Sequence, residues 1–248
     1  LGFHQGFSLY NVGFTAGIVG MVVLGFLNAF EIEVETKTLA NTESPLILYG
    51  ILIGLCVVLL ATSFYLHFKK KEKYHFKLLL KLSGRLPSDF VEMTNLATVT
   101  FNMSIMGLIL LGYVMINGGQ LNGPIVGSII GAMSFGAFGN QVKNTVPVLV
   151  GIMIGCYLTG VDVASTSALV AAIFGTTLAP VSGYYGPLAG VIAGFVHITL
   201  VSHVVVMHGG LNLYNNGFAG GFVAAVLVPI FEIFEGIRQD IKERKAEG

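Results

Sequence analysis

His208-Gly-Gly-Leu-Asn-Leu-Tyr-Asn-Asn-Gly-Phe218 has a counterpart near the start of the chain, His4-Gln-Gly-Phe-Ser-Leu-Tyr-Asn-Val-Gly-Phe14. A constant offset of 204 residues aligns these two motif copies, and seven of the eleven aligned positions are identical. Uncommon residues such as His, Tyr and Asn are among the identities, and an apolar run of helical length follows each copy. We interpret the pair as an internal duplication.

The composition places the chain in a membrane. Of its 248 residues, 54% are hydrophobic and 10% charged, and the mean hydropathy is +0.81, whereas soluble domains carry roughly 25% charged residues. A net charge of zero argues against nucleic acid as a partner. Cys56 and Cys156 lie in separate apolar runs without ligand-like spacing, so we expect neither a disulfide nor a metal site.

Several apolar runs are long enough to cross a bilayer, which takes about 20 residues of helix. We therefore expect an all-α integral membrane protein with about eight transmembrane or re-entrant helices. Two of the runs, 123–139 and 163–179, are short and rich in Gly, Ser or Thr, so each either crosses fully or re-enters from one side. The eight runs are 12–30, 45–68, 96–116, 123–139, 145–160, 163–179, 187–207 and 217–235.

Basic residues predict the orientation, because they favour the cytoplasmic side. One cluster begins at Lys69, and a second follows the last apolar run from Arg238. We therefore divide the chain into six parts: the end of a first repeat, whose remainder we expect to be missing (1–30), an extracellular acidic loop (31–44), a transmembrane helix (45–68), a basic cytoplasmic connection (69–94), the transmembrane core of a second repeat (95–236) and a cytoplasmic tail (237–248).

The two motif copies are separated by seven predicted crossings, an odd number, so the repeats are expected to be antiparallel. Inverted repeats of this kind are common in secondary transporters and some channels. A second echo, Gly-Pro-x-x-Gly-x-x-x-Gly, occurs at 123–131 and 186–194. Its glycines favour close helix packing over contact with a solute.

Neutral polar side chains in the motif copies are the candidate substrate ligands. Their amides, phenols and imidazoles could bind a small polar solute or an ion, or could instead build turns that cap the following helices. The candidates are His4, Tyr10, Asn11, His208, Asn212, Tyr214, Asn215 and Asn216.

Three further residues are candidates for ion or proton coupling. Asp162 is one of two charged residues between 95 and 230, and it is either a coupling site or an exposed helix cap. His197 and His203 could relay protons or serve as structural residues. They are six positions apart, so they do not form a metal pair.

The duplicated motif, together with Leu121-Asn-Gly-Pro124 and the stretch Ser134–Val148, resembles the bacterial membrane proteins called domain of unknown function 1576. In that family the domain typically occurs twice in one polypeptide, which implies a missing N-terminal repeat or a partner chain here. The family implies no substrate. Val12 stands where the second copy has Asn216, so a site built from both copies would be asymmetric.

No catalytic or cofactor motif is present, so we expect no enzyme activity and no cofactor. The expected function is transport of a small polar solute or ion across the bacterial cytoplasmic membrane. The alternatives are a non-transporting scaffold or assembly subunit and a passive channel similar to urea transporters, the latter by analogy alone. The lipid bilayer is the expected partner, and the sequence leaves open whether the protein forms a homo-oligomer.

Overall fold

The computed structural model describes residues 1–33, 45–211 and 214–247. Every regular element in these ranges is helical, as the sequence predicts. The elements are α1 (Asn11–Ala29), α2 (Ile47–Lys69), α3 (Phe76–Leu79), α4 (Phe90–Met93), α5 (Leu96–Ile116), α6 (Gly123–Ser134), η1 (Phe135–Ala137), α7 (Val142–Thr159), α8 (Thr166–Gly175), η2 (Thr176–Leu178), α9 (Ala179–Tyr185), α10 (Pro187–Val201), α11 (Val204–Met207) and α12 (Asn215–Glu247).

Six helical segments in the described ranges are long and apolar enough to cross a membrane, namely 11–29, 47–69, 96–116, 142–159, 166–185 and 215–239. Two shorter apolar helical segments, 123–137 and 187–201, complete the set. The chain is therefore a multi-pass membrane protein, and the sequence estimate of about eight helices is close.

One expected boundary is wrong. The sequence analysis ended a short run at residue 179, but α8, η2 and α9 form one path from Thr166 to Tyr185. Pro180 lies in the first turn of α9, where proline removes no helical hydrogen bond. The segment is therefore long enough to span the bilayer.

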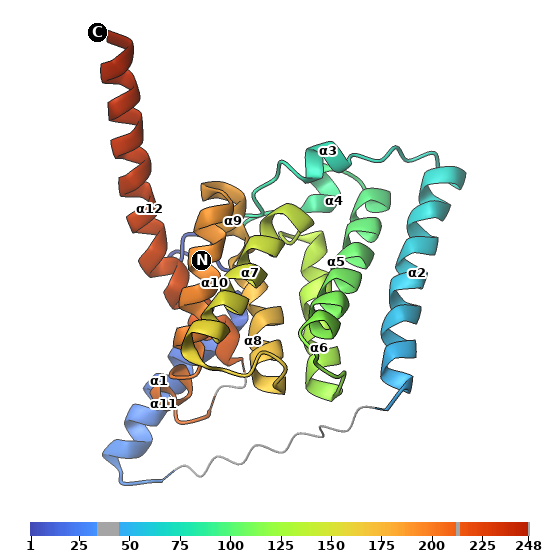
Figure 1. Cartoon of the computed structure of the whole chain (residues 1–248). Helices are drawn as coiled ribbons and strands as arrows, with labels where there is room; N and C mark the ends of the chain where they lie inside the picture. The colour runs from blue at the N-terminus through green and yellow to red at the C-terminus, as the bar shows by residue number, and fades with distance from the viewer. Residues whose placement is uncertain (34–44, 212–213, 248) are drawn as a thin grey trace.

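The loops gather at two opposite ends of the helical body (Figure 1). The C-terminal end of α12 and the connection that carries α3 and α4 lie at one end, and the loop between α5 and α6 lies at the other. The basic connection and the C-terminus thus lie at the same end of the helical body. The expected tail from 237 onward continues α12 as helix, and of the acidic loop only 31–33 fall within the described residues.

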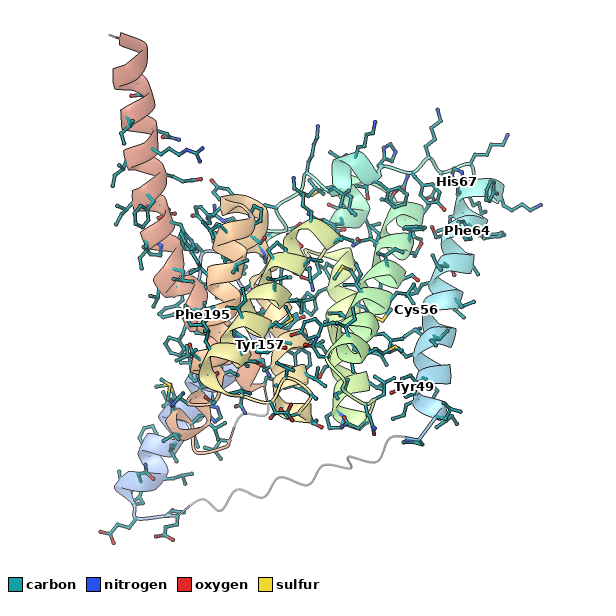
Figure 2. The ribbon with its side chains drawn as sticks, viewed as in Figure 1. Tyr49, Cys56, Phe64, His67, Tyr157 and Phe195 are labelled. Carbon is teal, nitrogen blue, oxygen red and sulfur yellow. The ribbon has the colours of Figure 1, made fainter. Side chains whose placement is uncertain are left out.

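Helix α2 packs on α5 through one narrow face, and most of its remaining surface is exposed (Figures 1 and 2). Leu52, Cys56 and Ser63 form the buried face. The Ser63 hydroxyl donates to the Ala97 carbonyl at 2.7 Å, and the Ser104 hydroxyl donates to the Cys56 carbonyl at 2.9 Å. Such interhelical hydrogen bonds stabilise helix association in a membrane, where the hydrophobic effect does not drive helices together.

Helices α7 and α10 make the closest helix pair of the core. A methyl group added at Gly194 would meet the Val148 carbonyl oxygen, and one added at Gly151 would meet the Val191 carbonyl oxygen. The packing interpretation of the glycine spacing is therefore correct for α10, where glycine lets the two backbones approach directly.

The helical path breaks between η1 and α7, inside the protein. The buried Asn102 amide donates to the carbonyls of Gly136 and Asn140, both at 2.8 Å. Asn140 itself donates to the Ala132 carbonyl at 3.2 Å. Side chains thus replace the backbone bonds lost at the break, as an interior without water requires.

Gly194→Ala should destabilise the protein. The added methyl group would overlap the α7 backbone, and overpacking of this kind typically costs about 1–3 kcal/mol. Thermal unfolding of the purified protein in detergent should show a midpoint several degrees lower. The matched control is Gly54→Ala on α2, where a methyl group meets nothing within 4 Å. Equal midpoints for the two variants would contradict the packing argument.

Candidate functional site

Residues 1–10, which carry most of motif copy 1, are fixed by contacts with Arg85 and its neighbour. The Arg85 guanidinium donates from Nε to the Gln5 carbonyl at 2.9 Å and lies 4.5 Å from the centre of the Phe7 ring. The Leu86 N–H donates to the Gly6 carbonyl at 2.9 Å. The segment is therefore held to the basic connection before it reaches the core.

Motif copy 1 then docks on the two threonines of η2, Thr176 and Thr177, which we call the threonine pair. The N–H groups of Leu9 and Tyr10 donate to the carbonyl and the hydroxyl of Thr177, at 3.0 and 2.9 Å. Ser8 and Thr177 share a hydroxyl–hydroxyl bond of 3.1 Å. One backbone bond and two bonds to the Thr177 hydroxyl therefore hold this short segment on η2.

The Tyr10 phenol ends in a polar cluster behind this segment. The Thr176 hydroxyl donates to the Ile173 carbonyl at 2.6 Å, so it accepts from the Tyr10 hydroxyl at 3.0 Å and from the Asn140 amide at 3.3 Å. The Asn140 Oδ1 atom is buried and has no hydrogen-bond partner in the structure. The Asn140 amide thus joins the two helix breaks, at η1 and η2, and the Tyr10 phenol bonds to the same threonine hydroxyl.

Helices α1 and α12 run in opposite directions and pack against each other through the residues that the motif shares (Figure 1). A methyl group at Gly13 or at Gly217 would lie 3.0 Å from the other glycine's Cα atom. The Phe14 ring occupies the space beside Gly221, and the Phe218 ring occupies the space beside Gly17. Each contact therefore has its counterpart 204 residues away, so the interface is reciprocal.

Both motif histidines are buried. The His4 Nε2 atom lies 2.9 Å from Asn11 Oδ1, an acceptor, and Nδ1 accepts the Ser8 N–H at 3.3 Å. This pattern assigns the neutral tautomer with the proton on Nε2. His208 packs edge-on against the Phe218 ring, with 5.5 Å between the ring centres. In this structure the histidines hold the motifs in place, and neither lines the cavity described next.

A cavity of about 510 Å³ lies where the two motif copies meet α6 and α8. Its size falls in the range of small-molecule sites. The lining is aromatic, aliphatic and amide-bearing, without an ionisable group apart from two phenols. It consists of Leu9, Tyr10, Asn11, Val12, Gly13, Gly127, Gly131, Phe135, Val170, Phe174, Tyr214, Asn216 and Gly217.

The glycines on α6 correct the sequence interpretation. Close packing was expected at Gly127 and Gly131, but a methyl group at Gly127 would meet nothing within 4 Å, and one at Gly131 would meet the Phe174 ring at 3.3 Å. Both glycines line the cavity. Their lack of side chains creates space for an occupant, whereas the equivalent glycines of α10 create contact with α7.

Four of the predicted substrate ligands, Tyr10, Asn11, Tyr214 and Asn216, line this cavity. Asn215 is not among the lining residues, and its Oδ1 atom is buried without a hydrogen-bond partner. Asn212 lies outside the described residues.

The three candidates for coupling lie in different surroundings. His197 is buried on α10, and its Nε2 atom donates to Asn216 Oδ1 at 3.2 Å, so it supports a residue of the cavity wall. Asp162 is exposed and accepts the Ala164 N–H at 3.0 Å, which is the geometry of a turn cap. His203 is also exposed, beside Ser202. Neither of the last two lines the cavity.

Sequence reasoning missed the threonine pair, Asn140 and the two rings Phe135 and Phe174. Adjacent threonines inside an apolar run were a usable signal, because each buried hydroxyl needs a partner. The rings carried no signal of their own. Within the described residues, no group of three or more His, Cys, Asp or Glu is placed to hold a metal ion.

Comparison with protein families identifies residues 1–29 and 68–233 with the family described as protein of unknown function (DUF1576). The chain belongs to this family. No curated protein and no solved structure matches it. Moving the first matched stretch along by the motif offset of 204 gives 205–233, which ends where the second stretch ends. Most of helix α2 falls between the two stretches, and α2 is also peripheral in this structure.

The threonine pair and Tyr10 should be energetically coupled. Tyr10→Phe and Thr176→Val each remove one side of a buried hydrogen bond, so their costs should be non-additive by about 0.5–3 kcal/mol. A double-mutant cycle of thermal or denaturant unfolding in detergent measures this coupling. The control pairs Tyr10→Phe with Thr62→Val, an exposed hydroxyl on α2 that bonds only its own helix, and it should be additive. Additivity in both cycles would contradict the proposed link.

Proposed function

We propose that this DUF1576 protein moves a small, uncharged polar solute across the membrane through the cavity between the motif copies. One observation carries the proposal: the cavity is lined by residues of both copies together with α6 and α8. Residues that recur 204 positions apart meet around one space, which is the arrangement expected of a solute site between two repeats.

The lining indicates the class of solute. Asn11 and Asn216 offer amide groups, Tyr10 offers the face of its ring, and Tyr214 offers a ring and a phenol. A full charge on the solute would meet no countercharge among the lining residues, and an unpaired charge is costly in such surroundings. The cavity therefore favours neutral molecules with hydroxyl, amide or carbonyl groups over ions.

The ends of two helices support the same choice. Helices α1 and α12 both begin beside the cavity, at Asn11 and Asn215. A helix N-terminus carries a partial positive charge from its free N–H groups, so the oxygen atoms of a neutral solute would be attracted there. In many transporters, broken helices offer their ends to the substrate in this way.

Passive movement is the mode that the lining favours. An ion-coupled carrier uses a titratable group near the solute, but Asp162 and His203 lie away from the cavity, and His197 contacts it only through Asn216. We therefore place the protein with facilitators or channels rather than with pumps.

The antiparallel course of α1 and α12 and their reciprocal contacts support an inverted repeat. In a bacterial cytoplasmic membrane, the basic connection and the C-terminus would face the cytoplasm by the positive-inside rule. The loop after α1 would then face outward.

Filling the cavity should block flux. Gly127→Leu adds a side chain that points into open space, so the protein should fold and fail to transport. Liposomes containing the purified protein would be mixed with urea, glycerol, ribitol or choline chloride, and swelling would be followed by light scattering. We expect swelling above that of protein-free liposomes for at least one neutral probe and not for choline, with at least a tenfold lower rate for Gly127→Leu.

The matched control for this experiment is Gly54→Leu, an equal change on the exposed side of α2, which should keep the flux of the parent. Flux that is absent for every neutral probe, or that survives Gly127→Leu unchanged, would reject transport through this cavity. In that case the scaffold or assembly role becomes the better account of the two motif copies.

The proposed orientation can be checked in whole cells. In a variant without Cys56 and Cys156, Glu33→Cys should react with a membrane-impermeant maleimide added outside, whereas Lys71→Cys should react only after the cells are opened. Both side chains are exposed. Glu33 follows α1 and Lys71 follows α2, and the C-terminal ends of these two helices lie at opposite ends of the helical body. The reverse labelling pattern would place the C-terminus outside.

A further inference from the structure

Helices α1 and α12 are equivalent by the 204-residue offset, but one face of each has a different environment. On α12, Ala219, Val223 and Leu227 are all less than a tenth exposed. Their equivalents on α1 are Thr15, Val19 and Val23, and all three are exposed. The positions recur at intervals of four, so they form one helix face. The same face is therefore covered in one copy and uncovered in the other.

The cover on α12 comes from its own unit. Val223 and Leu227 belong to the main core cluster, and α12 contacts α8, η2 and α10. A methyl group added at Gly220 would meet the Thr177 side chain. The covered face of α12 therefore packs against the threonine pair and against the neighbouring helices α8 and α10.

On α1 the equivalent face borders a groove of about 640 Å³, lined by Asn11, Val12, Thr15, Ala16, Val19, Gly20, Val23 and Leu211. This face of α1 also carries small residues, as the covered face of α12 does: Ala16 is equivalent to Gly220, and Gly20 is equivalent to Ala224. Small residues on one face are typical of helices that pack on other helices.

A lipid-facing position behaves differently. Val22 on α1 and its equivalent Val226 on α12 are exposed to similar extents, 56% and 59%. Val19 is also 56% exposed, yet its equivalent Val223 is 1% exposed. Val19 and Val22 are therefore equally exposed on α1, but the equivalent of Val19 is buried on α12 and the equivalent of Val22 is exposed.

We propose that this face of α1 is the docking surface for a second unit of the same family, which presents segments equivalent to α8, η2 and α10. The inference rests on the duplication that underlies the proposed function. An intact second copy of this chain does not fit, because its own α12 already covers the corresponding segments. The occupant is instead the unit for which α1 serves as the final helix, joined to it as residues 96–201 are joined to α12.

Docking would change the solute site. Motif copy 2 would meet the threonine pair of the second unit as copy 1 meets Thr176 and Thr177, which would bury Tyr214, now 61% exposed. The segment equivalent to α10 would cover Val12, now 73% exposed, because its equivalent Asn216 contacts His197 on α10. The cavity would then be closed on the side where Tyr214 and Val12 stand. Docking therefore separates the solute site from lipid.

Lipid accessibility of Val19 and Val22 tests the docking. In full-length protein lacking Cys56 and Cys156, Val19→Cys and Val22→Cys would carry a nitroxide label, and relaxation by dissolved oxygen would be measured in liposomes. We expect at least threefold lower accessibility at position 19. Val223→Cys and Val226→Cys supply the covered and lipid-facing references. Val23→Cys replaces Val19→Cys if that variant does not elute as the parent does. Equal accessibility at 19 (or 23) and 22 would overturn the proposal.

The occupant would be identified by placing a photo-reactive phenylalanine analogue at position 19 and sequencing the crosslinked peptide. A peptide from a second family unit supports the proposal. Lipid adducts alone, a peptide from 96–201 of a second identical chain, or an unrelated protein would each overturn it. Because neither readout depends on solute movement, lack of flux together with a shielded position 19 would reject transport and leave the docking surface in place.

Discussion

The reciprocal contact between α1 and α12 is the constraint on which the rest of this structure depends. Each helix brings a phenylalanine to the other's glycine, and Gly13 and Gly217 let the backbones touch between them. In lipid, association between helices draws little from the hydrophobic effect and relies on close packing and hydrogen bonds. The crossing therefore needs residues without side chains at fixed positions, and the repeated motif supplies them in both copies.

The same physics explains the buried polar network. A backbone group left unpaired in a dry interior costs several kcal/mol, so a break in a helix survives only where side chains take over the lost bonds. Asn102 and Asn140 do so at η1, and Thr176 is shared by Tyr10 and Asn140 at η2. The breaks bring neutral hydrogen-bonding groups near an otherwise apolar cavity without introducing a charge. A neutral solute is the occupant that such a wall would bind at least cost.

Glycine has two different uses in this fold, and its spacing does not distinguish them. Gly131 and Gly194 occupy equivalent places in the Gly-Pro-x-x-Gly-x-x-x-Gly echo. Gly194 is pressed against the α7 backbone, whereas Gly131 lines the cavity. The difference depends on whether the backbone of a neighbouring helix lies beside the glycine, and the local sequence pattern does not encode that distance.

The sequence alone determined the membrane class, most of the helical runs, the shared side of the two basic segments and the duplicated motif. These follow from hydropathy, length and residue identity, which act locally along the chain. It also named four of the residues that line the cavity, because they are the polar side chains of the two motif copies. Only the tertiary structure decided that Phe135 and Phe174 complete the wall, that Thr176 and Thr177 receive motif copy 1, and that Asp162 stands apart in an exposed turn. Those outcomes depend on which helices pack together and at what height, and such contacts join residues far apart in the chain, as the bond between Ser8 and Thr177, 169 positions apart, shows.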